Sequence, residues 1–66
     1  MCEANVYLID EDGRELLFLE AVDKIIPTDN GLMLENIFSE RKSVKASIKE
    51  MTLVAHKIVL EKITGN

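Results

Sequence analysis

The sequence predicts an all-β domain: a small antiparallel barrel or a rolled sheet of about six short strands. Three observations predict this class. The chain has only 66 residues, enough for a single β domain (1–66) with one modest core. Turn signals recur at short intervals, and the apolar segments between them are short and rich in β-branched residues. Closing or rolling such a sheet removes exposed strand edges, which are sites of aggregation.

The first half of the sequence predicts four strands separated by turns. The strands are expected at residues 3–10, 14–20, 21–27 and 32–38. Asp12-Gly13 lies between apolar runs, and this dipeptide is a strong signal for a β-hairpin. The stretch PTDNG (27–31) combines residue types that favour turns. The apolar faces of these strands are expected to come from Val6, Leu8, Leu16, Phe18, Ile25 and Ile26.

The segment 41–63 fits two different patterns. As an amphipathic helix it would place five apolar residues on one face: Val44, Ile48, Met51, Ala55 and Ile58. The segment also begins with RKSVKASIK, which alternates as a strand does, and it is rich in β-branched residues, which lower helix propensity. No glycine or proline marks a turn near Ala55-His56, which weakens the strand interpretation. For residues 41–63, strands are the favoured interpretation and a helix is the alternative.

The size and cysteine content of the chain indicate that it needs a partner. A chain of this length buries only about 60% of the surface that it exposes when unfolded, so it is marginally stable alone. Its single cysteine, Cys2, cannot form an internal disulfide, so we expect a homodimer. No apolar run reaches the roughly 20 residues of a membrane helix, and residues 1–6 lack the features of a signal peptide. We therefore expect a cytoplasmic protein that does not contact membranes and whose cysteine stays a thiol.

The charge is −4 overall and unevenly spread. Ten of the twelve acidic residues lie in residues 1–40, and six of the eight basic residues lie in residues 41–66. A net negative charge disfavours binding to nucleic acid. The basic last third still leaves an alternative open, an RNA-binding small β-barrel in which Arg41, Lys45 and Lys49 line one exposed strand face. Such charged residues more often serve to block aggregation at a strand edge.

Cys2 offers the most specific chemistry in the sequence. In an unmodified chain, the α-amine of Met1, the amide nitrogen of Cys2 and its sulfur can bind one metal ion through two five-membered chelate rings. Three nearly coplanar nitrogen and sulfur donors suit square-planar Ni(II) or Cu(II) better than tetrahedral zinc. A second chain can supply the fourth donor. Because the thiol and the amine must lose protons to bind, the affinity should rise with pH.

Two other possibilities apply to this corner of the chain. Cys2 shares strand parity with Ala4, Val6 and Leu8, so the residues alone also allow a buried cysteine at the end of a core. Removal of Met1 would leave an amine and a thiolate on the first residue, and two such chain ends would form an N2S2 plane around the metal.

Several segments of the sequence resemble the CooT family of small nickel-binding proteins, which are associated with the maturation of carbon monoxide dehydrogenase. The segments are MCEANVYL at the start, the DG hairpin, LE.V..I.P in the middle and ERK…IKEM.LV.HKIVLE in the tail. The resemblance implies a compact β fold, a homodimer and nickel held through Cys2. With this resemblance, metal binding becomes the favoured interpretation of Cys2.

The remaining expectations concern His56, catalysis and the function of the protein. His56 is the single histidine, and its neighbours suggest an exposed or locally hydrogen-bonded position in a turn between two strands; a supporting role beside the metal is the alternative. The sequence lacks a Ser-His-Asp set and a glycine-rich phosphate loop, so we expect no enzyme activity. The hypothesis is a metallochaperone that delivers Ni(II) to an apo-metalloenzyme such as carbon monoxide dehydrogenase, or to its maturation proteins.

Overall fold

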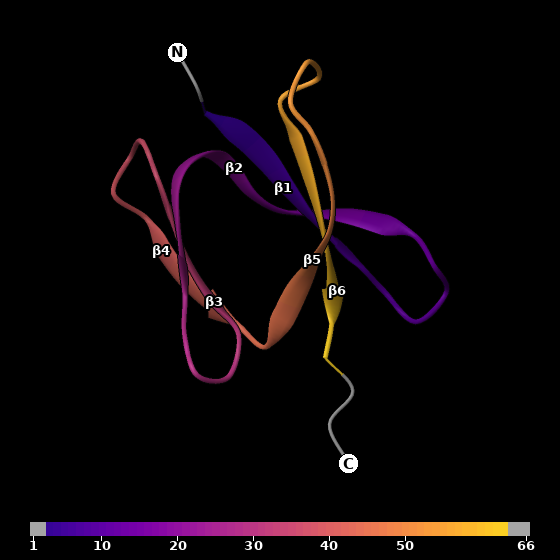
Figure 1. The fold of residues 1–66 in the computed structure, drawn as a ribbon. Coiled ribbons are helices and arrows are strands. Elements are labelled where there is room, and N and C mark those ends of the chain that lie inside the picture. The colour runs from indigo at the N-terminus through magenta and orange to yellow at the C-terminus, as the bar shows by residue number, and fades with distance from the viewer. Residues whose placement is uncertain (1–2, 64–66) are drawn as a thin grey trace.

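The computed structural model describes residues 3–63, and every regular element in this range is a strand (Figure 1). The strands are β1 (Ala4–Ile9), β2 (Glu15–Pro27), β3 (Leu32–Asn36), β4 (Arg41–Val44), β5 (Ala46–Thr52) and β6 (Lys57–Lys62). The all-β prediction is confirmed, and so is the strand interpretation of the tail. A helix long and apolar enough to cross a membrane is not found within the described residues.

All six strands belong to one sheet in the order β4-β3-β2-β1-β6-β5. Neighbouring strands are antiparallel, except that β1 and β6 are parallel, so the sheet is mixed where an antiparallel one was predicted. The two edge strands, β4 and β5, are consecutive in the chain and separated only by Lys45. The sheet therefore curls back on itself as a roll (Figure 1), and β4 and β5 are not paired with each other.

Strand β2 spans both halves of the roll. The sequence predicted two strands, 14–20 and 21–27, but the structure has one long strand that bends at Ala21. The backbone of Ala21 has a φ of 54°, in the left-handed region that a non-glycine residue rarely adopts. Its amide donates to Asn5 Oδ1 at 3.0 Å, and its carbonyl accepts from the amide of Ile37 at 3.0 Å. The bend lets the first half of β2 pair with β1 and the second half with β3.

The core lies inside the roll. Its buried residues come from every strand except β4 and are Val6, Leu19, Val22, Leu32, Leu34, Ala46, Ile58 and Leu60. Of the apolar residues predicted to face it, Val6 is fully buried, while Leu8, Phe18 and Ile25 pack against the core from partly buried positions. Leu16 and Ile26 are exposed instead. Ile26 follows Ile25 directly in β2, and successive side chains of a strand point to opposite faces, so only one of the two can face the core.

The turn between β3 and β4 is held by a buried side chain. Asn36 Oδ1 accepts hydrogen bonds from the amides of Phe38 and Glu40 at 3.0 and 2.9 Å, and Asn36 Nδ2 donates to the Glu40 carboxylate at 2.6 Å. These bonds pair every polar atom of the buried amide, which would otherwise be costly to remove from water. They also fix the conformation of a turn that presents Ile37 and Phe38 to solvent.

Candidate metal centre

The predicted metal ligands, Met1 and Cys2, lie outside the described residues. The description begins at Glu3, which leads directly into β1. Because Cys2 is bonded to Glu3, the Cα atoms of the two residues are separated by one peptide unit, about 3.8 Å if trans. The surroundings of Glu3 therefore define the environment to which the predicted ligands are attached.

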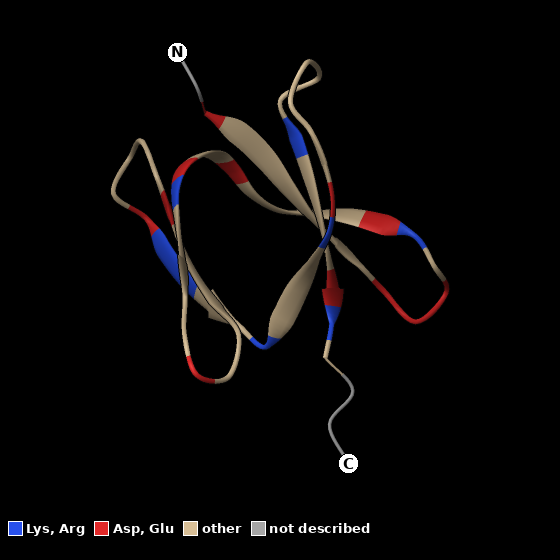
Figure 2. Cartoon of the chain, viewed as in Figure 1, with Lys and Arg blue, Asp and Glu red and all other residues tan. Residues whose placement is uncertain are grey.

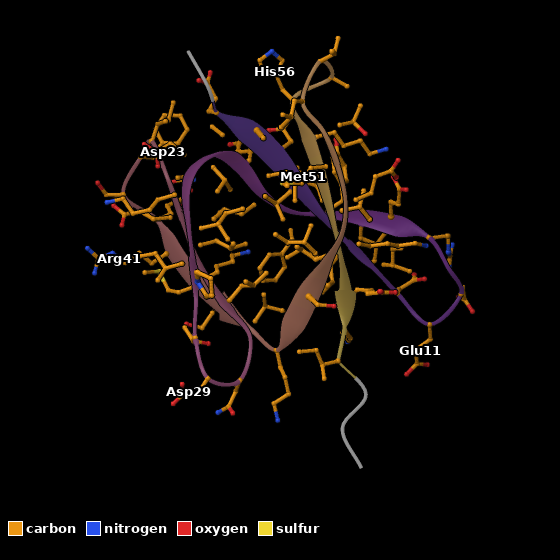
Figure 3. All side chains as sticks on the ribbon, viewed as in Figure 1. Glu11, Asp23, Asp29, Arg41, Met51 and His56 are labelled. Carbon is orange, nitrogen blue, oxygen red and sulfur yellow. The ribbon has the colours of Figure 1, made fainter. Side chains whose placement is uncertain are left out.

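His56 lies beside Glu3, although the two residues are far apart in the sequence. Figure 3 labels His56 at the end of the molecule where the described chain begins. The Nδ1 atom of His56 is 3.2 Å from the carbonyl oxygen of Glu3. A carbonyl oxygen only accepts hydrogen bonds, so this contact requires a proton on Nδ1 and, in the neutral ring, leaves a lone pair on Nε2. The carbonyl of His56 in turn accepts from the amide of Asn5 at 2.8 Å. Both the ring and the backbone of His56 are thus attached to the start of β1.

The parallel pairing of β1 with β6 explains this proximity. In a parallel pair the first residues of both strands lie at the same end of the sheet, and Asn5 is the partner of Lys57 in the register. The preceding turn is closed by hydrogen bonds from Ala55 to Thr52 at 3.2 Å and from His56 to Leu53 at 3.1 Å. His56 adopts a φ of 53° there. The predicted turn position of His56 is confirmed, even though no glycine or proline marks it.

A small hollow separates His56 from the bend in β2. It has a volume of about 330 Å³ and is lined by Glu3, Asn5, Ala21 and His56. Asn5 connects two sides of its rim, because it accepts a hydrogen bond from the amide of Ala21 and donates one to the carbonyl of His56. Within residues 3–63, no group of three or more His, Cys, Asp and Glu side chains comes together as a metal-binding cluster.

Lys57, the residue after His56, is paired with an acidic partner. Its Nζ atom donates to a carboxylate oxygen of Glu15 at 2.6 Å and lies 5.3 Å from the centre of the Tyr7 ring. The hydrogen bond to Glu15 raises the pKa of Lys57, chiefly because it favours the charged ammonium. The positive charge next to His56 is therefore balanced by a carboxylate.

The three basic residues of the RNA-binding alternative do not share one strand face. Arg41 begins β4, where its Nε atom lies 3.3 Å from a carboxylate oxygen of Glu35. Lys45 forms the link between β4 and β5, and Lys49 lies at a register shift within β5. Figure 2 shows the corresponding basic positions as separate blue segments. The expected single strand is interrupted at Lys45, so the three residues do not lie on one continuous strand.

These features define a small all-β domain with a polar corner where β1 and β6 begin together. The chain belongs to the CooT family, because the family model described as "CO dehydrogenase accessory protein CooT" matches residues 1–61. Among solved structures, it is similar to a crystal structure described as "putative CooT from Carboxydothermus hydrogenoformans". That chain is 55% identical, with a TM-score of 0.86, and the match covers 94% of this chain and 98% of the other. A comparison with curated proteins gives no significant match.

Proposed function

We propose that this protein carries Ni(II) as cargo for the maturation of a nickel enzyme such as carbon monoxide dehydrogenase, and that Met1 and Cys2 hold the metal. The observation that carries the proposal is the extent of the family match. The match to the carbon monoxide dehydrogenase accessory family begins at residue 1, so it includes both proposed ligands.

The donor chemistry fits a transferable nickel ion. An amine, a deprotonated amide and a thiolate form a planar set that suits Ni(II). A fourth donor from a second copy of the chain completes the plane. A square plane leaves its axial faces open, so a thiolate of the acceptor protein can attack the metal before the carrier releases it. Transfer by ligand exchange of this kind needs no catalytic residue in the carrier.

His56 supports the site without binding the metal. Its Nδ1–H donates to the carbonyl of Glu3, the residue that follows Cys2, and so fixes the direction in which the chain enters the site. Hydrogen bonds of this type around a metal centre orient the ligands and reduce the entropy that is lost on binding.

Replacing His56 with asparagine is expected to lower the nickel affinity by about 10-fold to 100-fold, the usual effect of losing such a supporting contact. Asparagine tolerates the left-handed backbone that His56 adopts, with a φ of 53°, so the turn should be retained. Isothermal titration calorimetry gives the affinity. The sulfur-to-nickel absorption band should persist, since the thiolate stays. An unchanged affinity would remove His56 from the site.

An N-terminal extension tests whether the α-amine is a ligand. Nickel added to the unmodified chain should produce near-UV charge-transfer absorption from sulfur to nickel, and the band should be lost when two extra residues precede Met1. The extension turns the amine into an amide and so removes the strongest neutral nitrogen donor. A band of the same intensity and affinity in the extended chain contradicts the proposed ligand set. Repeating the titration in high salt separates this site from phosphate-type binding, which weakens steeply with ionic strength.

A further inference from the structure

Asn30 and Gly31 are adjacent in the turn between β2 and β3. Figure 3 labels Asp29, in the same turn, and His56 at opposite ends of the molecule, so this turn is remote from the candidate metal centre. Asn30 is exposed to solvent. The side-chain carbon of an asparagine can be attacked by the backbone nitrogen of the next residue, and a glycine obstructs that attack least because it has no side chain. The turn therefore contains the two groups of a reaction within the chain itself.

The backbone nitrogen of Gly31 is not used to hold the turn together. The turn is closed by the amide of Thr28, which donates to the carbonyl of Gly31 at 2.8 Å, so the bond uses the oxygen of Gly31. Among the backbone hydrogen bonds of turns and links in residues 3–63, the amide of Gly31 is a donor in none. The nitrogen can therefore approach the side chain of Asn30 without first breaking a bond of this kind.

The two other asparagines of the described chain, Asn5 and Asn36, are protected from the same reaction. Each is followed by a β-branched residue, Val6 or Ile37, whose side chain crowds the attacking nitrogen. The amide of Ile37 also donates to the carbonyl of Ala21 at 3.0 Å, and the buried side chain of Asn36 is held through both its oxygen and its nitrogen. Asn5 Oδ1 accepts from the amide of Ala21. Reactivity is therefore expected at Asn30 alone among the three.

The turn at Asp12-Gly13 shows the opposite arrangement of the same two groups. The amide of Gly13 donates to the carbonyl of Asp10 at 3.0 Å, and the carboxylate of Asp12 accepts from Arg14 Nη2 at 2.8 Å. The nitrogen and the side chain that would have to combine are both held by other partners, and an ionised carboxylate resists attack more than a neutral amide does. Of the two glycine turns, the one at Asn30 is therefore the reactive one.

We propose that Asn30 is a site of spontaneous deamidation, a covalent modification that the chain undergoes without an enzyme. The nitrogen of Gly31 forms a bond to Cγ of Asn30, the bond from Cγ to Nδ2 breaks, and ammonia leaves with the proton that Gly31 gives up. The product is a five-membered succinimide ring. Water then opens the ring at either carbonyl, which yields aspartate or isoaspartate, and no oxidant or reductant is consumed. This inference goes beyond the proposed function, because Met1 and Cys2 take no part in it.

The two products differ in their effect on packing. Both place a new carboxylate in an open hollow of about 530 Å³ that Asn30 and Lys45 line together, and Lys45 forms no ion pair with a carboxylate in the described part of the chain. In isoaspartate the main chain runs through the side chain, which adds one atom directly before Gly31. A Cβ on Gly31 would already lie 2.8 Å from the Cα of Lys45, so the extra length has little room. Isoaspartate should therefore destabilise the domain, and aspartate should not.

Incubation of the full chain at mildly alkaline pH tests the proposal. Anion-exchange chromatography at pH 7 should show a growing form whose net charge has changed from −4 to −5, because one neutral amide has become one carboxylate. Trypsin releases residues 25–41, which contain both Asn30 and Asn36, and tandem mass spectrometry should place the mass increase on residue 30. The rate should rise with pH, since the attacking nitrogen must lose its proton. Asn30→Gln would have to close a larger ring and should lose the reaction.

The same samples show whether the modification changes stability. The isoaspartate form should unfold at a lower urea concentration than the unmodified chain, and freshly prepared Asn30→Asp should unfold near the midpoint of the unmodified chain. An Asn30 amide that stays intact through the incubation overturns the proposal, and so does conversion of Asn36 at the same rate. Equal urea midpoints for all three forms would overturn the effect assigned to isoaspartate.

Discussion

Replacing Cys2 with serine is expected to abolish the sulfur-to-nickel absorption band and to lower nickel affinity by at least about 100-fold. Loss of a contact that merely supports a metal ligand costs about 10-fold to 100-fold, so loss of a ligand should cost at least as much. Serine keeps the size and the amide nitrogen but supplies a hydroxyl, which does not ionise near neutral pH and is a poor donor to Ni(II). Cys2 is the single thiol of the chain, so no other cysteine can replace it.

A charge-only substitution provides the control for this experiment. Glu3→Gln removes the neighbouring carboxylate and leaves the thiol, and it should retain the absorption band with nearly the same affinity. Absorption spectroscopy and calorimetry on the two variants distinguish coordination by sulfur from a general attraction of cations to an acidic chain. Persistence of the band in Cys2→Ser would refute the proposed site, and equal losses in both variants would favour a purely electrostatic one.

Replacing Gly31 with alanine is expected to destabilise the fold by about 3 kcal/mol or more, near the upper range for forcing extra atoms into a packed region. A Cβ at this position would lie 2.8 Å from the Cα of Lys45 and closer still to the carbonyl oxygen of Val44. Both atoms belong to the backbone, so no side chain can rotate away. A domain of this size has a total stability of only about 3–10 kcal/mol, so much of the population should unfold.

Gly13→Ala separates this steric effect from the ordinary cost of losing a glycine. Gly13 has a φ of 82°, but a Cβ there meets no atom within 4 Å. Its replacement should cost only about 1–2 kcal/mol, the penalty for a left-handed backbone with a side chain. Urea denaturation at one fixed protein concentration compares the two variants, since self-association adds to the apparent stability. Equal urea midpoints for Gly13→Ala and Gly31→Ala would show that the backbone of Val44 and Lys45 can shift to accommodate a Cβ on residue 31.

Gly31 also illustrates what sequence reasoning found and what it missed. The stretch PTDNG predicted a turn, and a turn forms there, with the amide of Thr28 donating to the carbonyl of Gly31 at 2.8 Å. The sequence did not show that the link between β4 and β5 passes against this glycine. Local turn chemistry depends on the residues of the turn itself, whereas the close approach depends on how far the sheet curls.

The candidate metal centre likewise combines features that the sequence predicted with one that only the structure showed. The unique thiol, the turn position of His56 and the apolar face containing Val6 were all evident from residue types and alternation. The contact between His56 and Glu3 was not, because it depends on a parallel pair formed by the first and last strands. Nothing in the alternation of a strand specifies which distant strand lies beside it.

The sequence by itself predicted an all-β chain, the positions of several of its turns, and Cys2 as the candidate metal ligand. Residue spacing and turn-forming residues act over a few positions, so strands and turns can be predicted from the sequence alone. Only the tertiary structure decided that 14–27 is one strand bent at Ala21, that the tail divides at Lys45, and that β1 and β6 start side by side. Those outcomes depend on burying one shared core, because strands distant in sequence must pack together before any of them is stable.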